Sequence, residues 1–177
     1  MADPAQIAEL TDKMAAERAS LLTALESLSE ENASHSPNDG EWTAKQQMSH
    51  LCEMESAYRA WVERALEEDG ADVDGVRGER VAIPLEDADA HAAAEHTAEM
   101  RRQRQKTLAL INSMKPEDFE RRASNSLFGS LTVMQWLRSY YRHDRMHVDQ
   151  ISGREPEYKP RFAGGSEPDQ RRAPRTH

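Results

Sequence analysis

Two histidines spaced four residues apart, His143 and His147, are the pair in this sequence best placed to do chemistry together. In a helix, side chains four apart lie on one face with Cβ atoms about 5–6 Å apart, so two such imidazoles can bind one metal ion. Helical periodicity places both within the same arc of roughly 120° as the apolar residues around them. We therefore expect both imidazoles to point into the core, where each needs a hydrogen bond or an ion as partner.

A third histidine, His50, lies on the inward stripe of another predicted helix, together with apolar residues and Gln47. A single histidine on an apolar face is most often a core imidazole that a backbone carbonyl satisfies. Three inward histidines in one chain make a shared metal ion the competing interpretation.

The remaining histidines form weaker patterns. His35 lies in a segment dense in turn-forming residues, and we expect it to be exposed on a loop. His91 and His96 are five residues apart, a spacing that places them on different faces of a helix. We do not expect these two to chelate an ion.

Cysteine and acidic residues offer no second site. Cys52 falls on the opposite side of its helix from Met54, so we interpret it as a reduced thiol and not as a ligand. Asp69, Asp72 and Asp74 lack the spacing and the closing glutamate of a calcium-binding loop. We expect a solvated acidic loop there.

Arg101, Arg102 and Arg104 crowd one predicted helix where its apolar side is thin. They form either a solvated face or the mouth of a pocket for an anionic substrate. We favour the solvated face, because helix charges are usually exposed.

Four long helices are predicted to position these side chains, because apolar residues recur at helical intervals in four stretches that are nearly free of Gly and Pro. These stretches cover about residues 5–30, 43–66, 87–114 and 132–151. Both histidine-bearing helices begin with Thr-x-x-Gln, the pattern of a capping box, at Thr43 and at Thr132.

The connections show no alternating strand pattern of any length. Residues 67–85 read as a long acidic connection and residues 117–129 as a mostly irregular crossing segment. We predict an all-α four-helix bundle over residues 1–152. Residues 153–177 are rich in Gly, Pro and charge, and we expect a largely disordered tail.

Composition narrows the function classes. The chain has 177 residues, one cysteine and a formal net charge of -9. The charge opposes binding to nucleic acid and to anionic membranes, so we expect neither as a partner. No apolar run approaches the roughly 20 residues that cross a bilayer, and no charged N-terminal segment precedes an apolar run. We expect a cytoplasmic protein.

Several motifs together resemble the DinB/YfiT-like superfamily of metal-binding four-helix bundles. They are WTAKQQMSHL at residues 42–51, HDRMHVDQI at residues 143–151, and the intervening MKPEDFERRA and LFGSLTVMQWL. They occur in the family's order and cover nearly the whole chain up to Ile151. The resemblance implies a three-histidine metal site between helices two and four. His50, His143 and His147 would bind one divalent ion there and leave positions open to water or substrate, as in catalytic zinc sites. Imidazole suits several first-row ions, and zinc or nickel is the ion we expect.

Asp144 has two interpretations. It lies beside His143 on the inner arc, where it could accept a hydrogen bond from a ligand histidine. It could equally form a salt bridge to a neighbouring helix. The sequence leaves both open.

The resemblance implies two kinds of function. One is a metal-dependent enzyme acting on a small molecule, either a hydrolase or a transferase that uses a low-molecular-weight thiol as cofactor. No catalytic side chain can be assigned, so metal-bound water or a metal-bound thiolate would be the reacting group. The other is a non-catalytic metal-binding stress-response protein.

The resemblance further implies a homodimer. Met48, Val62 and Met134 lie at the margins of the inward stripes, and we expect them to cover the dimer surface.

Overall fold

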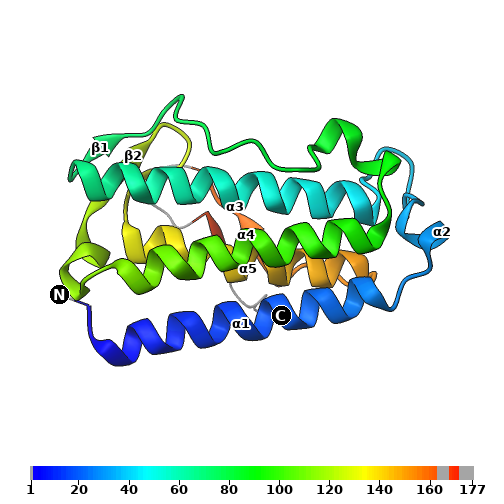
Figure 1. Ribbon diagram of the computed structural model, residues 1–177, viewed down its shortest axis with the longest axis horizontal. Coiled ribbons are helices and arrows are strands. Elements are labelled where there is room, and N and C mark those ends of the chain that lie inside the picture. The colour runs from blue at the N-terminus through cyan, green and yellow to red at the C-terminus, as the bar shows by residue number, and fades with distance from the viewer. Residues whose placement is uncertain (1, 163–167, 172–177) are drawn as a thin grey trace, which may run out of the picture.

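Four long helices run side by side along the long axis of the molecule (Figure 1). The computed structural model describes residues 2–162 and 168–171. The long helices are α1 (Pro4–Glu26), α3 (Ala44–Glu67), α4 (Ala93–Ser113) and α5 (Val133–Ile151). α1 packs against α5 and α4, and α3 packs against α4 and α5. The predicted all-α four-helix bundle is confirmed.

Capping boxes start the two histidine-bearing helices. At α3 the Thr43 hydroxyl accepts a hydrogen bond from the Gln46 amide at 3.1 Å, and the Thr43 amide donates to Gln46 Oε1 at 3.0 Å. Thr132 and Gln135 repeat this exchange at α5, at 3.2 and 2.9 Å. Each box satisfies two backbone groups that a helix start would otherwise leave unpaired, which fixes where both helices begin.

Two helix boundaries differ from the sequence prediction. The first helix ends at Glu26, and a separate short helix, α2 (Glu30–Ala33), follows with the Ser29 hydroxyl as its N-cap. The third begins at Ala93, after the 3-10 helix η1 (Leu85–Ala90).

The break before α4 has a visible cause. His91 and Ala92 are extended, and the Glu95 carboxylate accepts a hydrogen bond from the Ala92 amide at 2.8 Å. His96 Nε2 lies 2.8 Å from the Ala88 carbonyl oxygen. These local contacts start α4 at Ala93 despite the strong helix propensity of this alanine-rich stretch.

A small sheet closes one end of the bundle, where irregular backbone was expected. Residues 117–129 contain most of the 3-10 helix η2 and a strand that pairs with two others. The elements are η2 (Pro116–Glu120), β1 (Ala71–Asp72), β2 (Arg122–Asn125) and β3 (Gly129–Thr132). β2 lies between β1, which is parallel to it, and β3, which is antiparallel. Strands of two to four residues are too short to show an alternating pattern.

The C-terminal segment contains two further short strands, β4 (Tyr158–Pro160) and β5 (Asp169–Arg171), which pair antiparallel. The composition of residues 153–177 predicts a largely disordered tail. Part of that segment, residues 163–167 and 172–177, lies outside the described residues. Among the helices of the described residues, none is long and apolar enough to cross a membrane.

Candidate metal centre

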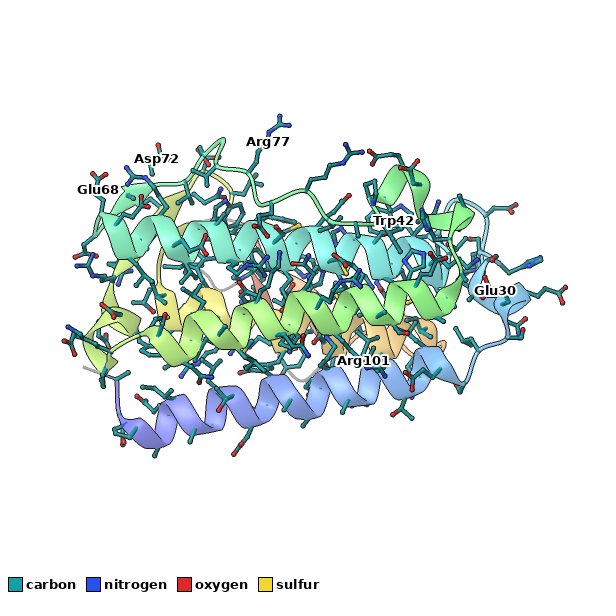
Figure 2. The ribbon with its side chains drawn as sticks, viewed as in Figure 1. Glu30, Trp42, Glu68, Asp72, Arg77 and Arg101 are labelled. Carbon is teal, nitrogen blue, oxygen red and sulfur yellow. The ribbon has the colours of Figure 1, made fainter. Side chains whose placement is uncertain are left out.

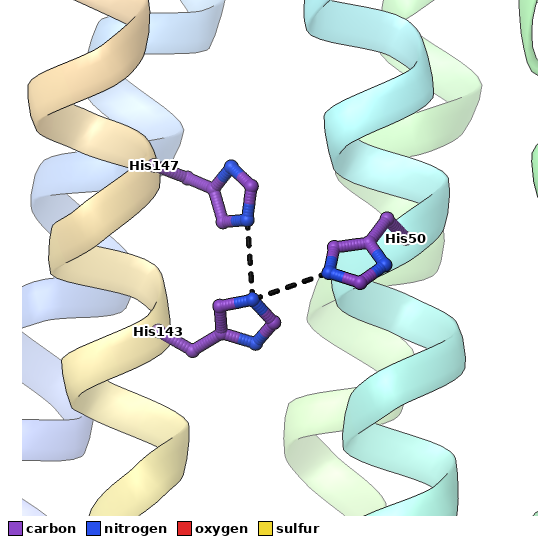
Figure 3. Close-up of side chains that lie close together, drawn as sticks. All are labelled: His50, His143 and His147. Carbon is purple, nitrogen blue, oxygen red and sulfur yellow. Dashed lines mark hydrogen bonds between the residues drawn. The ribbon is translucent and has the colours of Figure 1, made fainter. Parts of the chain in front are cut away.

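Three histidines from two helices meet inside the bundle. His50 comes from α3, and His143 and His147 come from α5 (Figure 3). Nε2 of His143 lies 3.2 Å from Nε2 of His50 and 3.2 Å from Nε2 of His147. In the described part of the chain, this is the group of His, Cys, Asp or Glu side chains whose ligand atoms lie close enough to hold one ion, all within 4.8 Å.

The spacing of these nitrogens fits a metal ion. Zn–N bonds of 2.0–2.1 Å in a tetrahedral arrangement place two ligand nitrogens about 3.3 Å apart. A contact between two Nε2 atoms requires one of them to carry a proton, whereas an ion accepts lone pairs from all three rings. The donor set therefore suits a divalent first-row ion.

Burial keeps the three imidazoles neutral. His143 and His147 are buried, and His50 is half-buried. Burial lowers the pKa of His50 to about 4, and burial together with the nearby His50 lowers the pKa of His147 to about 3. Burial and the two neighbouring rings hold the pKa of His143 well below its usual value. At neutral pH no proton must leave these rings before they bind a metal.

Gln47 fixes the orientation of His147. Its Oε1 lies 2.9 Å from Nδ1 of His147, and its Nε2 donates to the Trp42 carbonyl oxygen at 3.3 Å. Because the amide nitrogen is committed to Trp42, the amide oxygen faces the imidazole and accepts the Nδ1 proton. This leaves Nε2 of His147 with its lone pair directed at the other two rings.

A pocket of about 580 Å³ opens on the histidine cluster. His50, His147 and Gln47 line it, whereas His143 is not part of its lining. Its other lining residues come from the loop before α3, from α5 and from the turn after α5. They are Pro37, Asn38, Gly40, Glu41, Trp42, Met146, Gln150, Gly153, Arg154, Glu155 and Pro156. The three histidines would hold the ion, and the pocket beside His50 and His147 is large enough for a small organic molecule.

Asp149 holds the turn that forms one wall of this pocket. Its carboxylate accepts hydrogen bonds from Arg154 Nε and Nη2 at 3.2 and 3.0 Å, and from the Glu157 amide at 3.2 Å. Gly153 permits the turn with a φ of 69°. The start of the expected tail is therefore part of the pocket.

A buried ring of four charges lies beside the cluster, with one residue from each long helix. Arg18 of α1 donates to Asp144 at 3.0 Å and to Glu55 of α3 at 2.6 Å. Arg104 of α4 donates to Glu55 and to Asp144 of α5, both at 2.8 Å. Burial raises the pKa of Glu55, but Arg104 and Arg18 outweigh it and lower that pKa to about 2. The ring ties all four helices together at the level of His143.

This ring decides between the two interpretations of Asp144. The Asp144 carboxylate pairs with Arg18 of α1 and Arg104 of α4, so the interpretation as a salt bridge to neighbouring helices is the one observed. The residue that orients a site histidine is Gln47. A polar side chain on an apolar stripe, three residues before His50, is the signal in the sequence that could have indicated it.

The three arginines of α4 differ in their exposure to solvent. Arg101 and Arg102 are exposed and pair with Glu26 and Glu99, as expected of a solvated face. For Arg104 that expectation is wrong, because its side chain is buried in the charge ring. None of the three lines the pocket at the histidines.

The other histidines and Cys52 belong to no metal-ligand group in the described residues. His35 is exposed, and His91 contacts Glu95 while His96 contacts a carbonyl. Cys52 is buried, and burial raises the pKa of its thiol.

The three aspartates of the loop after α3 serve the small sheet. Asp69 accepts from the Arg122 amide at 2.8 Å, and Asp74 accepts from Asn125 at 2.9 Å. Asp72 accepts from the Asp74 amide at 2.9 Å.

The three residues that were expected to form a homodimer surface are buried within the chain, so that part of the prediction is wrong. Met48, Val62 and Met134 are 1, 0 and 8% exposed, because they pack inside the bundle of a single chain. That the protein forms a homodimer remains a prediction, but these three residues cannot form the dimer surface.

The chain is similar in sequence to known proteins. The sequence model of the DinB superfamily matches residues 13–151. The uncharacterized protein YuaE of Bacillus subtilis (strain 168) is 28% identical over 138 residues, which cover 72% of this chain and 85% of YuaE.

Two solved structures share the fold. YfiT from Bacillus subtilis, described as a probable metal-dependent hydrolase with an unusual four-helix bundle topology, matches with a TM-score of 0.68 and 19% identity, over 86% of this chain and 87% of that one. The four-helix bundle protein TT2238 matches with a TM-score of 0.63 and 20% identity, over 83% and 98% of the two chains.

Proposed function

Because the chain belongs to the DinB superfamily, we propose that it is a metal-dependent hydrolase of a small molecule, with His50, His143 and His147 as the metal ligands. The observation that carries the proposal is that two of the three clustered histidines, His50 and His147, line a pocket of about 580 Å³. The description of YfiT as a probable metal-dependent hydrolase supports the same reaction class.

Zinc or nickel is the ion we propose. Imidazole is a good ligand for both, and three neutral histidines leave further coordination positions open. When bound, such an ion supplies a Lewis acid that polarises a carbonyl and acidifies water. The chain's own contribution is to hold the three nitrogens in place, with Gln47 orienting His147 and Asp149 shaping the pocket wall.

A purely structural ion is the less favoured alternative. Structural zinc sites are closed by four protein ligands, whereas the ligand group in the described residues contains three. Two of those three ligands, His50 and His147, line the pocket and are reached from it. This arrangement favours an enzyme over a non-catalytic metal-binding protein.

Transfer to an external thiol is the second candidate function. The one cysteine of the chain, Cys52, is buried with a raised pKa, so it cannot act as the nucleophile. A thiol-dependent reaction would therefore need a low-molecular-weight thiol, and the pocket has the volume to admit one beside a substrate.

One assay separates these functions. Protein loaded with zinc or with nickel is tested on a panel of small esters, amides and alkylating electrophiles, with and without a low-molecular-weight thiol. Metal-dependent turnover without thiol supports the hydrolase, and turnover that requires thiol supports the transferase. No turnover with either metal, in protein that binds one ion per chain, would favour the non-catalytic alternative.

A further inference from the structure

The two helices that carry the histidines start alike but differ in the residues around the cap. At α5 the residue before the cap, Leu131, and the fourth helical residue, Trp136, are both 0% exposed. This apolar pair is the usual partner of a capping box and fixes the direction of the chain. At α3 the corresponding residues are Trp42, which is 41% exposed, and the polar Gln47.

At α3 both positions instead serve the metal centre. Gln47 donates to the Trp42 carbonyl oxygen and accepts the Nδ1 proton of His147. The Trp42 indole lies against His50, with ring centroids 4.7 Å apart and planes tilted by 53°. Figure 2 shows Trp42 at the α2 end of the bundle, where α3 begins. The aromatic ring is therefore fixed directly beside the histidines.

The Trp42 indole is an exposed large apolar side chain in the pocket lining. Among the described residues, the exposed large hydrophobic side chains are Trp42, Leu127 and Phe162, and of these only Trp42 lines the pocket. Exposing an aromatic ring to water is unfavourable, and covering it with another ring recovers free energy. Trp42 thus offers a flat apolar face to a molecule that occupies the pocket.

The charged residues of the pocket are already paired. Glu41 accepts from Asn38, Glu155 pairs with Lys159, and Arg154 is held by Asp149. A charged ligand would have to compete with these contacts, whereas an uncharged ring on Trp42 displaces only water. The pocket therefore favours a flat uncharged group over a strongly charged one.

We propose that Trp42 is a substrate-contacting wall, and that the substrate carries a flat unsaturated or aromatic group next to the bond that reacts. This inference rests on the proposed function, because the reacting bond is placed at the three histidines. Trp42 would select the substrate by stacking, while the histidines anchor its reacting end.

Two hydroxamic acids test the proposal without any turnover. Benzohydroxamate and cyclohexanecarbohydroxamate chelate a metal through the same group, but only the first carries a flat ring. Their dissociation constants are measured by calorimetry on the zinc-loaded native protein, on Trp42→Leu and on Trp42→Phe. Aromatic pairs contribute about 0.5–1.5 kcal/mol beyond area burial, which corresponds to about two- to twelvefold in affinity.

We expect the native protein to prefer benzohydroxamate by about two- to twelvefold, Trp42→Phe to keep most of that preference, and Trp42→Leu to lose it. All three proteins should bind one zinc ion with the same affinity. An equal preference in native protein and Trp42→Leu would overturn the role of Trp42 and leave the proposed function standing. A parallel loss of zinc affinity in Trp42→Leu would show that Trp42 only supports His50. Failure of both hydroxamates to bind zinc-loaded native protein would contradict the open metal site, and the proposed function with it.

Discussion

The amide oxygen of Gln47 lies 2.9 Å from Nδ1 of His147, and the amide nitrogen of the same side chain donates to the Trp42 carbonyl oxygen. The two contacts together set which nitrogen of His147 carries the proton. Partners of this kind orient metal ligands and are worth about 10- to 100-fold in metal affinity.

Replacing Gln47 by Ala should therefore weaken zinc binding by about 10- to 100-fold, because His147 loses the acceptor that holds its ring. Gln47→Glu keeps an acceptor oxygen for His147 but loses the donor to the Trp42 carbonyl, so it should retain more zinc affinity than Gln47→Ala. Competition with a chromophoric chelator measures both variants. Native affinity in Gln47→Ala, with its fold intact by circular dichroism, would refute the orienting role.

The charge ring predicts a large effect on stability. Asp144→Ala leaves Arg18 and Arg104 buried with one carboxylate between them, and removing one partner of a buried ion pair destabilises by about 3–5 kcal/mol. Urea denaturation of the metal-free protein measures this change. The matched control is Glu9→Ala, which breaks the exposed Lys13–Glu9 pair and should leave the unfolding midpoint nearly unchanged. Similar midpoints for the two variants would contradict a structural role for the ring.

The lowered histidine pKa values predict how metal binding depends on pH. An ordinary histidine begins to lose a metal below its pKa near 6.5, because protonated imidazole cannot be a ligand. His50 has its pKa lowered to about 4 by burial, so zinc affinity should stay nearly constant from pH 7 to about 5 and fall below that. A tenfold loss of affinity per pH unit starting at 6.5 would show that the histidines are solvated in the metal-free protein.

The same shift predicts the stability of the metal-free protein. In the unfolded chain His50 takes up a proton as the pH falls through about 6.5, whereas in the folded chain it does so only near 4. The unfolded state therefore binds more protons between these values, and the free energy of unfolding should decrease from pH 6.5 to pH 4. In urea titrations, a His50→Leu variant should show a weaker decrease than native protein over this range.

Metal removal should leave the fold in place. Trp136, Phe119, Met14 and Leu131 are almost completely buried, so a core exists without the ion. The chelated protein should keep its helical circular dichroism at room temperature. Added metal should raise the melting temperature, since a ligand at about a hundred times its Kd stabilises the native state by about 2.7 kcal/mol. Loss of most helical signal on chelation would identify the ion as a structural element.

The sequence predicts those features that repeat along one helix. His143 and His147 share a face because of their spacing, and Thr43 and Thr132 start their helices through contacts only three residues away. Such short-range relations can be deduced from the order of residues in the sequence alone.

Relations between helices could not be deduced in this way. Arg104 appears as one of three arginines on a polar stretch, and its pairing with Glu55, 49 positions earlier, becomes visible only when α3 and α4 pack. The role of Asp149 is hidden for a similar reason, because the turn it holds follows α5 in a segment whose composition indicates disorder. The strands β1 and β2 pair across about 50 residues with too few positions to form a pattern.

The most direct test of the three-histidine centre is the metal content of purified protein after zinc or nickel loading, compared with His143→Ala, His147→Ala and the exposed-loop control His35→Ala. We expect native protein and His35→Ala to retain one ion per chain, and both site variants to lose most of it while remaining folded. Equal metal content in all four proteins would contradict the assignment of these histidines as the ligands.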